Sequence, residues 1–401
     1  MKRNLLVLLV LFIGVGCALS APALAGGKGK VLHAFHGGSD GSEPYGALIS
    51  DSSRNFYGTT KLGGGTGCSG GAGCGTVFEL APHGTEKVLY AFKGGSDGAN
   101  PMAALLSDNM GNLYGTTQAG GASDEGTVFV ISPDGIETQI YAFKGGSDGA
   151  APSGSLIMAS GGDRYGTTEN GGSGTCGTTG CGTVFEITAA GAEKVIYSFQ
   201  GGSDGAGPAA GLIADSEGNM YGTTFYGGGN QNCSGFGCGT VFIVTPDGTE
   251  SVLYSFQGNY DGAGPTCNLI FDDLGNLYGT TRGGGPPGHG TVFELSPDGT
   301  ETVLYSFQAG LDGNIPVAGV IMDTSGNLYG ATYSGGSTKC HGFGCGTVFK
   351  VAPNGREKVL YAFGQDRYPE AALLAGPHGL LYGTTTVGGA HKDGAVFSVK
   401  K

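Results

Sequence analysis

Residues 265–307 read PTCNLIFDDLGNLYGTTRGGGPPGHGTVFELSPDGTETVLYSF, and this stretch decides the fold. It holds four short runs rich in apolar, β-branched or aromatic residues and bounded by Gly, Asp, Asn or Pro, at 268–272, 275–281, 290–295 and 303–307. Such runs are typical of β-strands rather than helices. Pro297-Asp298-Gly299 is a tight-turn sequence, because proline presets φ and glycine accepts a positive φ. The stretch therefore predicts two hairpins, which together make four antiparallel strands.

The same unit recurs seven times along the chain. The tripeptide Tyr-Gly-Thr, or a close variant, gives anchors that are 51 to 57 residues apart. The anchor tyrosines are Tyr57, Tyr114, Tyr165, Tyr221, Tyr278, Tyr329 and Tyr382. Seven copies of a four-stranded unit leave two main arrangements, a linear solenoid or a closed ring of blades.

The two ends of the repeat array favour the ring. Residues 31–35 match the fourth strand of the other units, whereas residues 396–399 match a third strand. The first segment can therefore complete the last blade, which removes a free sheet edge. We predict an all-β fold, a seven-bladed β-propeller of four-stranded antiparallel blades closed by the N-terminal strand, as a single domain over residues 26–401. The blades are expected at 44–92, 101–143, 152–199, 208–256, 265–307, 316–363, and 369–399 plus 31–35.

The repeat resembles a known family. The unit Asp-Gly-x-x-Pro-x-Ala-Gly-Leu-Ile-x-Asp-x-x-Gly-Asn-Leu-Tyr-Gly-Thr-Thr, followed by Gly-Gly, Gly-Thr-Val-Phe and Thr-Glu-x-Val-Leu-Tyr-Ser-Phe, is similar to the GloVer tandem repeat of secreted bacterial proteins, a choice-of-anchor family. Its first half is also similar to NHL-type propeller repeats. The resemblance covers nearly the whole mature chain and implies an exported or surface protein, but it brings no biochemical activity with it.

The first 25 residues have the pattern of a secretory signal peptide. Lys2 and Arg3 precede an apolar run, and Ala23-Leu24-Ala25 forms a small-x-small cleavage site. We expect export to the periplasm, the extracellular space or the cell surface. Lipid attachment at Cys17 is a minor alternative, because Gly14 stands where such a signal usually carries leucine. No later segment is apolar for 18 residues, so no membrane span is expected.

The charge of the chain bears on its partners. Without the signal, 18 Lys and Arg face 33 Asp and Glu, a net charge of −15. Nucleic acids select basic surfaces, so a nucleic-acid partner is not expected. The chain also has no tryptophan, which argues against propeller families that stack tryptophans between their blades. We expect a monomer.

Eight cysteines form four closely spaced pairs. They are Cys68 with Cys74, Cys176 with Cys181, Cys233 with Cys238, and Cys340 with Cys345. Each pair lies in a unit whose loop between the second and third strands is longer than in the other units. An exported chain meets oxidising conditions, so each pair is predicted to form a disulfide within its own inserted loop. Metal binding by these thiols is disfavoured by their spacing. Cys267 is expected to be a small buried residue.

Two loops of each propeller blade open on the same face: the loop that enters the first strand, and the loop that joins the second and third strands. We call this the long-loop face, and a binding site is expected there. Six entering loops carry an aspartate before glycine: Asp40, Asp97, Asp148, Asp204, Asp261 and Asp312. A turn role is favoured over cation binding, since Asp-Gly is an ordinary turn. No cofactor is predicted, although a bound Ca²⁺ stays an alternative. Blade seven departs from the pattern, with Gln365-Asp366-Arg367.

The residue after each Thr-Thr, or after Ala331-Thr332, varies most between the copies. These candidate ligand-facing residues are Lys61, Gln118, Glu169, Phe225, Arg282, Tyr333 and Thr386. A ring of unlike side chains is what an asymmetric recognition site needs, but an unconstrained surface looks the same. The sequence shows no nucleophile elbow, phosphate loop or zinc signature, and so no catalytic residue is predicted.

Two functions remain open from the sequence. The first is a non-enzymatic binding or adhesion propeller that recognises a carbohydrate or a surface protein through the long-loop face. The second is an extracellular polysaccharide or lactone hydrolase or lyase with carboxylates at the channel mouth, which rests on analogy with other propellers.

Overall fold

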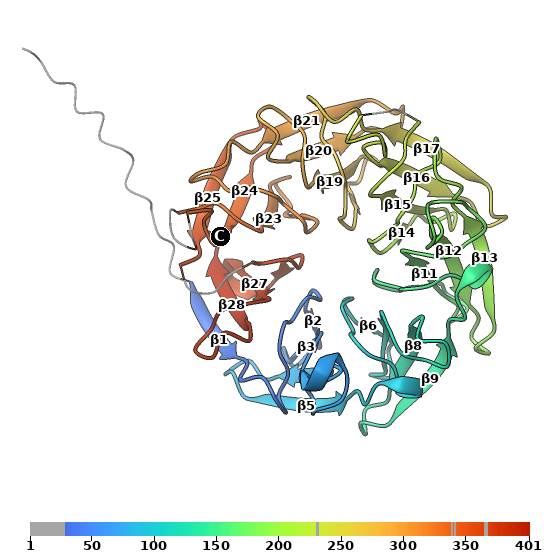
Figure 1. The fold of residues 1–401 in the computed structure, drawn as a ribbon. Helices are drawn as coiled ribbons and strands as arrows, with labels where there is room; N and C mark the ends of the chain where they lie inside the picture. The colour runs from blue at the N-terminus through green and yellow to red at the C-terminus, as the bar shows by residue number, and fades with distance from the viewer. Residues whose placement is uncertain (1–28, 230–231, 338–339, 341, 365–367) are drawn as a thin grey trace, which may run out of the picture.

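The Tyr-Gly-Thr segments form the second strands of seven four-stranded antiparallel sheets, which stand as blades around a common axis (Figure 1). This computed structural model describes residues 29–229, 232–337, 340, 342–364 and 368–401. The predicted signal peptide, the candidate lipid site at Cys17 and the segment 365–367 lie outside the described residues. Among the helices that are described, none has the length and hydropathy needed to cross a membrane.

The strands follow the same order in every blade. Blade one holds β2 (Ile49–Ser50), β3 (Phe56–Thr60), β4 (Thr76–Leu80) and β5 (Glu86–Ala91). Blade two holds β6 (Leu106–Ser107), β7 (Leu113–Thr117), β8 (Thr127–Ile131) and β9 (Glu137–Ala142). Blade three holds β10 (Ile157–Met158), β11 (Arg164–Thr168), β12 (Thr183–Ile187) and β13 (Glu193–Ser198). Blade four holds β14 (Ile213–Ala214), β15 (Met220–Thr224), β16 (Thr240–Val244) and β17 (Glu250–Ser255).

The later blades repeat this order. Blade five holds β18 (Ile270–Phe271), β19 (Leu277–Thr281), β20 (Thr291–Leu295) and β21 (Glu301–Ser306). Blade six holds β22 (Ile321–Met322), β23 (Leu328–Thr332), β24 (Thr347–Val351) and β25 (Glu357–Ala362). Blade seven holds β26 (Leu374–Ala375), β27 (Leu380–Thr385), β28 (Ala395–Lys400) and β1 (Lys30–Ala34). Short 3₁₀ turns are η1 (Ser69–Gly71), η2 (Gly95–Asp97), η3 (Gly146–Asp148) and η4 (Pro377–Gly379).

The ring closes through its first strand. β1 pairs antiparallel with β28, with a register that runs from Lys30 opposite Ser398 to Ala34 opposite Ala395. The sheet order β1-β28-β27-β26 makes β1 the outer strand of blade seven, as the adjacent blue and red strands in Figure 1 show. The predicted closure is therefore confirmed. The outer edge of β28 is covered, which removes an unpaired sheet edge from blade seven.

Each seam between neighbouring blades is filled by two phenylalanines. One ends the fourth strand of a blade and the other lies in the third strand of the next blade. Their rings meet edge to face with centroids 5.0–5.2 Å apart. The pairs are Phe35–Phe78, Phe92–Phe129, Phe143–Phe185, Phe199–Phe242, Phe256–Phe293, Phe307–Phe349 and Phe363–Phe397. Edge-to-face pairs add about 0.5–1.5 kcal/mol beyond the burial of their area, so the seams are strong and identical.

The glycine of Tyr-Gly-Thr is required by these rings. A Cβ at Gly222 would lie 2.6 Å from Cζ of Phe242, and a Cβ at Gly58 would lie 2.7 Å from Cζ of Phe78. Each phenylalanine therefore lies across the glycine of the neighbouring strand in its own blade. This contact explains why the tripeptide that anchors the repeat keeps a residue with no side chain.

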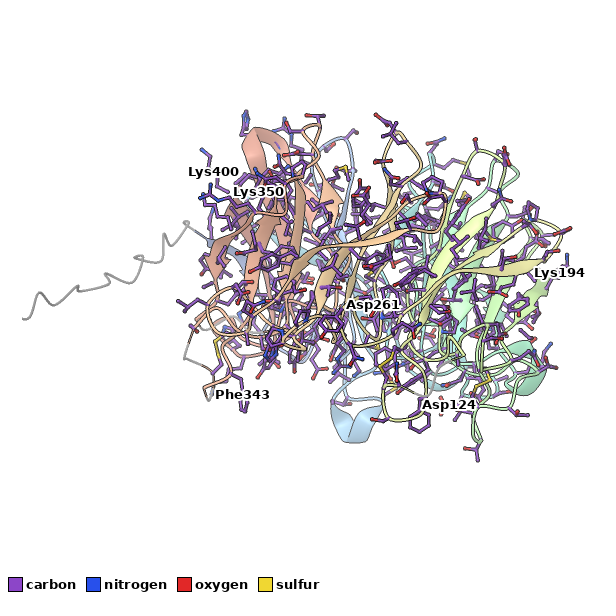
Figure 2. The ribbon with its side chains drawn as sticks, turned by 90° about the horizontal axis from the view of Figure 1, so that it is seen from above. Asp124, Lys194, Asp261, Phe343, Lys350 and Lys400 are labelled. Carbon is purple, nitrogen blue, oxygen red and sulfur yellow. A yellow bond between two sulfur atoms is a disulfide. The ribbon has the colours of Figure 1, made fainter. Side chains whose placement is uncertain are left out.

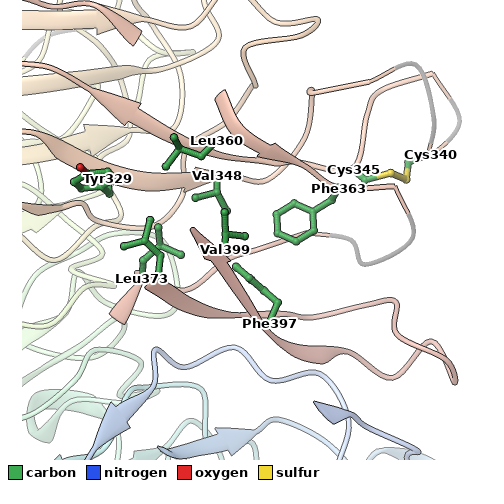
Figure 3. Packing of buried hydrophobic residues seen from close by; sticks show 10 residues of the cluster. Tyr329, Cys340, Cys345, Val348, Leu360, Phe363, Leu373, Phe397 and Val399 are labelled. Carbon is green, nitrogen blue, oxygen red and sulfur yellow. A yellow bond between two sulfur atoms is a disulfide. The ribbon is translucent and has the colours of Figure 1, made fainter. Parts of the chain in front are cut away.

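The core between blades six and seven shows how a seam is built (Figure 3). Val348, Leu360 and Phe363 of blade six pack against Phe397 and Val399 of blade seven. The Cys340–Cys345 disulfide lies at one end of this cluster, beside Phe363. The disulfide thus joins the apolar core to the loop above it.

The two faces of the ring differ. Tight turns join the first strand to the second and the third to the fourth on one face, whereas long loops occupy the other. Figure 2 shows the difference from the side: Asp124 and Phe343, both in long loops, lie on the face opposite Lys350 and Lys400. The long loops of the blades therefore lie together on one face of the ring.

The seam pairs give a direct test of what holds the ring together. Phe256 has no exposed surface, and we expect Phe256→Ala to lower the free energy of unfolding by about 3–5 kcal/mol, because it removes a ring from a packed seam. Phe236 is 69% exposed, so Phe236→Ala should change it by less than about 0.5 kcal/mol. Urea unfolding of both variants measures the difference, and equal losses would contradict the seam account.

Candidate functional site

The four cysteine pairs form the predicted disulfides. The bonds are Cys68–Cys74, Cys176–Cys181, Cys233–Cys238 and Cys340–Cys345, with Cα atoms 5.0–5.5 Å apart. Each one closes the long loop between the second and third strands of its own blade. Cys267 is 1% exposed, and burial raises the pKa of its thiol, as expected of a small core residue.

The aspartates of the entering loops turn back on their own loops. In blade three, Asp204 Oδ2 accepts hydrogen bonds from Tyr197 Oη at 2.9 Å and from the Gln200 amide at 2.7 Å. The same two hydrogen bonds are made by Asp97, Asp148, Asp261 and Asp312. Such hydrogen bonds within the loop are what we expect if the aspartates stabilise turns. Asp40 differs, because histidines replace its expected partners.

The variable residues after Thr-Thr share one backbone contact. Each donates its amide to the carbonyl of the residue that precedes the proline of the entering loop, at 2.9–3.2 Å. The donor and acceptor pairs are Lys61–Glu43, Gln118–Asn100, Glu169–Ala151, Phe225–Gly207, Arg282–Gly264, Tyr333–Ile315 and Thr386–Tyr368. Every blade thus places two unlike residues side by side on the long-loop face.

Sequence reasoning missed the second of these two rings. Its members all adopt a left-handed backbone, with φ of 54–64°, including the β-branched Ile315 at 59°. A left-handed conformation costs a residue with a Cβ about 1–2 kcal/mol. Only Gly207 and Gly264 avoid this cost. The other five copies carry a side chain in spite of this cost. The variability of the residue before each proline was the feature of the sequence that could have revealed this ring.

The two rings expose their side chains unequally. Arg282 is exposed, and Lys61, Gln118, Glu169, Phe225 and Tyr333 are half-buried. Thr386 is only 2% exposed, and its hydroxyl donates to Tyr368 O and Glu370 Oε1. Thr386 is therefore largely buried and bonded to residues of the neighbouring loop.

A charged group gathers around Glu370 at the inner ends of the long loops of blades five, seven and one. Thr386 Oγ1 lies 3.0 Å from Glu370 Oε1. Burial raises the pKa of Glu370 to about 7, although the Thr386 hydrogen bond and the charges of Lys61 and Arg282 act in the opposite direction. The Lys61 ammonium also lies 4.0 Å from Glu43 Oε2. The site therefore holds a carboxyl that changes protonation near neutral pH, beside two cations and a second carboxylate.

Aromatic rings adjoin this charged group. The Lys61 ammonium lies 5.1 Å from the centroid of the Tyr45 ring, and Tyr333 stacks on Tyr368 with centroids 4.3 Å apart. Burial, and then the charge of Glu370, raise the pKa values of Tyr45 and Tyr333. These tyrosines therefore stay protonated and can donate hydrogen bonds.

Two pockets open on the long-loop face beside Tyr226. One, of about 420 Å³, lies between blades four and five and is lined in part by Phe225, Tyr226, Arg282 and His289. The other, of about 600 Å³, lies between blades three and four and is lined in part by Glu169, Tyr226 and Phe236. Both pockets combine aromatic rings with a few polar groups, which is the usual make-up of a small-molecule site.

Two of the disulfide loops hold an exposed phenylalanine at the same position. The loops are Cys-Ser-Gly-Phe-Gly-Cys at 233–238 and Cys-His-Gly-Phe-Gly-Cys at 340–345. Phe236 is 69% exposed and Phe343 is 77% exposed, the latter projecting from the long-loop face in Figure 2. From the sequence, these loops were predicted only to be insertions closed by disulfides. Their shared Gly-Phe-Gly was the signal that could have identified them.

The outer rim carries a repeated pair of carboxyl groups. In blade four, burial and then the charge of Asp204 in the preceding seam raise the pKa of Glu250 to about 7. The same causes act on Glu86, Glu137, Glu193, Glu301 and Glu357. The turns on the opposite face behave differently. Burial acts to raise the pKa of Asp215, but hydrogen bonds from Asn219 and Tyr221 outweigh it and lower that pKa.

Comparisons with known proteins agree with this architecture. The family model described as the Gloeobacter/Verrucomicrobia repeat matches residues 22–236 and 231–401. Among curated protein sequences, none matches significantly.

Two solved structures resemble the chain at low sequence identity. One is the extracellular domain of a one-component system from B. thetaiotaomicron, with a TM-score of 0.56, 14% identity, and coverage of 90% of this chain and 40% of that one. Another is PorZ, a surface component of the type-IX secretion system of Porphyromonas gingivalis, with a TM-score of 0.54, 14% identity, and coverage of 92% and 47%. The chain thus spans less than half the length of either protein. At this identity the likeness concerns the fold alone.

The carboxyl groups predict how stability depends on pH. A glutamate with a pKa of about 7 in the fold, against about 4.3 unfolded, binds more protons in the native state, so the free energy of unfolding falls as pH rises from about 4.5 to 7. Turn aspartates with lowered pKa values stabilise the fold above about pH 4, and this stability is lost at lower pH. Calorimetry across pH 3–9 should find the highest Tm near pH 5.

Glu250→Gln isolates one of these groups. Its Tm should match that of the unmodified protein at pH 4 and exceed it at pH 8, because glutamine does not ionise. Glu217→Gln, at an exposed turn, serves as the control and should show no such change between the two pH values. A Glu250→Gln difference that stays constant with pH would contradict the assignment.

Proposed function

The chain belongs to the Gloeobacter/Verrucomicrobia repeat family, and on that premise we propose that it is an exported, non-enzymatic propeller that binds a carbohydrate or a surface protein through its long-loop face. The observation that carries the proposal is the pair of exposed phenylalanines, Phe236 and Phe343, each held in a loop closed by a disulfide. A disulfide restricts the conformations of the loop that it closes, so less conformational entropy is lost when an apolar side chain of that loop binds a partner.

The surroundings of Phe236 suit a carbohydrate best. Phe236 and Tyr226 lie with ring centroids 5.9 Å apart, and Tyr226 meets Phe225 at 4.5 Å. Beside them, His289 Nδ1 lies 3.1 Å from Asn314 Oδ1, and Arg282 is exposed. A sugar offers C–H faces to aromatic rings and hydroxyl groups to polar side chains. The aromatic residues and the polar residues of this surface could therefore both contact a sugar.

The disulfides support export. Four bonds within surface loops form and persist in the periplasm or outside the cell, where conditions are oxidising. The acidic chain is also suited to a soluble domain that does not associate with nucleic acid.

One observation favours the alternative, an extracellular hydrolase or lyase of polysaccharides or lactones. Burial raises the pKa of Glu370 to about 7, so its carboxyl can hold a proton near neutral pH, and the carboxyl of Glu43 lies near it. Such a pair can serve as general acid and general base, provided that a substrate reaches both.

A glycan array combined with a turnover screen tests the proposal on the mature protein. The double variant Phe236→Ala, Phe343→Ala should weaken binding to the selected glycan by about 2 kcal/mol, or roughly thirtyfold in Kd. Leu274→Ala is the matched control, because Leu274 is 81% exposed in a tight turn on the opposite face and should leave the Kd unchanged.

The same screen separates the two functions. Turnover that is abolished by Glu370→Gln, with binding retained, would overturn the non-enzymatic proposal and establish the hydrolase or lyase. Unchanged glycan affinity in the double phenylalanine variant would remove the long-loop phenylalanines from the binding site.

A further inference from the structure

Two histidines replace repeat residues in the closing strand alone. The outer strands of blades one to five end in Tyr-x-Phe followed by Lys or Gln, as in Tyr90 to Lys93 and Tyr197 to Gln200. In β1 and the residue pair that follows it, the same positions read His33-Ala34-Phe35-His36. The phenylalanine of the seam is kept, so the packing needs of the ring do not explain the exchange. Both exchanged positions are those that contact the loop aspartate in the other blades.

The two imidazoles converge on the aspartate of this blade. His36 Nδ1 lies 3.0 Å from Asp40 Oδ2, and His33 Nε2 lies 3.5 Å from the same oxygen. The three ligand atoms all lie within 4.8 Å of one another. The His33 and Asp40 side chains are 13% and 18% exposed, whereas that of His36 is 61% exposed. His33 Nε2 is buried and makes no hydrogen bond.

Blade one adds a further carboxylate to this group. Glu86 begins β5, and its Oε1 is buried without a hydrogen bond. The charges of Asp40 and His36 both act on the Glu86 carboxyl, so Glu86 lies near these two residues. A Cβ at Gly84 would collide with Leu32 O, so the turn before β5 packs directly on β1. The group therefore spans the seam between the closing strand and blade one.

We propose that His33, His36 and Asp40, with Glu86 close by, form a binding site for a divalent transition-metal ion of the Zn²⁺ type, and that this ion fixes the closing strand β1 to the loop that leads from it into blade one. Imidazole nitrogen and carboxylate oxygen are the ligands that Zn²⁺ takes in proteins, and His33, His36 and Asp40 supply three of them.

Only a small adjustment is needed to complete the coordination. Zn–N bonds of about 2.0–2.1 Å in a tetrahedral site place ligand atoms about 3.4 Å apart. The two distances to Asp40 Oδ2 already lie close to this value. The His36 side chain is exposed, so it can rotate towards His33 without disturbing the core; its ring lies 4.0 Å from that of His391, tilted by 30°.

The repeat itself supplies the variants for the test. His33→Tyr and His36→Gln install the residues found at the equivalent positions of blade three, Tyr197 and Gln200, where the same loop folds around Asp204. These variants should therefore fold, with a Tm in EDTA close to that of the unmodified protein. His289→Gln, far along the chain in blade five, is the control for adventitious histidine binding.

The experiment titrates Zn²⁺, and Co²⁺ as a spectroscopic probe, into tag-free mature protein freed of metal. We expect one equivalent of Zn²⁺ to bind, an absorption spectrum typical of four-coordinate Co²⁺, and a rise in Tm with Zn²⁺. His33→Tyr and His36→Gln should each lose the stoichiometric binding and the rise in Tm, whereas His289→Gln should keep both. Absence of binding in the unmodified protein, or equal binding by the two replacement variants, would overturn the proposal.

Discussion

The edge-to-face contact between two phenylalanines at each seam is the interaction on which the rest of the structure depends. One ring ends the outer strand of a blade and the other lies in the third strand of the next, so each blade is held by its neighbours and no blade stands alone. The contact also fixes the glycine of Tyr-Gly-Thr, over which the second ring lies. Because the last two contacts, Phe363–Phe397 and Phe35–Phe78, involve the two ends of the chain, a single kind of contact runs around the complete ring.

The fold could be predicted because the repeat states it seven times. Strand order, closure by residues 31–35 and the four disulfides all follow from comparing the copies with one another. Comparison of the copies says less about the candidate site, because the site depends on which side chains of different loops come into contact. Nothing in the spacing of Glu43, Lys61 and Glu370 indicates that they come together from blades one and seven. The exposed Phe236 and Phe343 could not be recognised in the same way, since most phenylalanines in the described part of the chain are buried in the core.

Departures from the repeat are where this molecule differs from a plain scaffold. The identical parts, which are the seams, the paired threonines and the aspartate turns, bury their groups or bond them within the ring. The unlike parts lie on the long-loop face, where the residues before each proline accept a left-handed backbone that only glycine adopts without cost. Disulfides then hold the largest insertions in place. A stiff ring with one varied face is the arrangement expected of a protein that recognises a partner.

Hydrogen exchange of the amides in β1 tests the central claim, that the first strand closes the ring, most directly. If β1 is the outer strand of blade seven, the amides of residues 31–35 that pair with β28 should exchange only when the whole domain unfolds, as slowly as the paired amides of β17 in the middle of the chain. Rapid exchange in this segment, at the rate of a free chain end, would contradict closure and leave blade seven with an open edge.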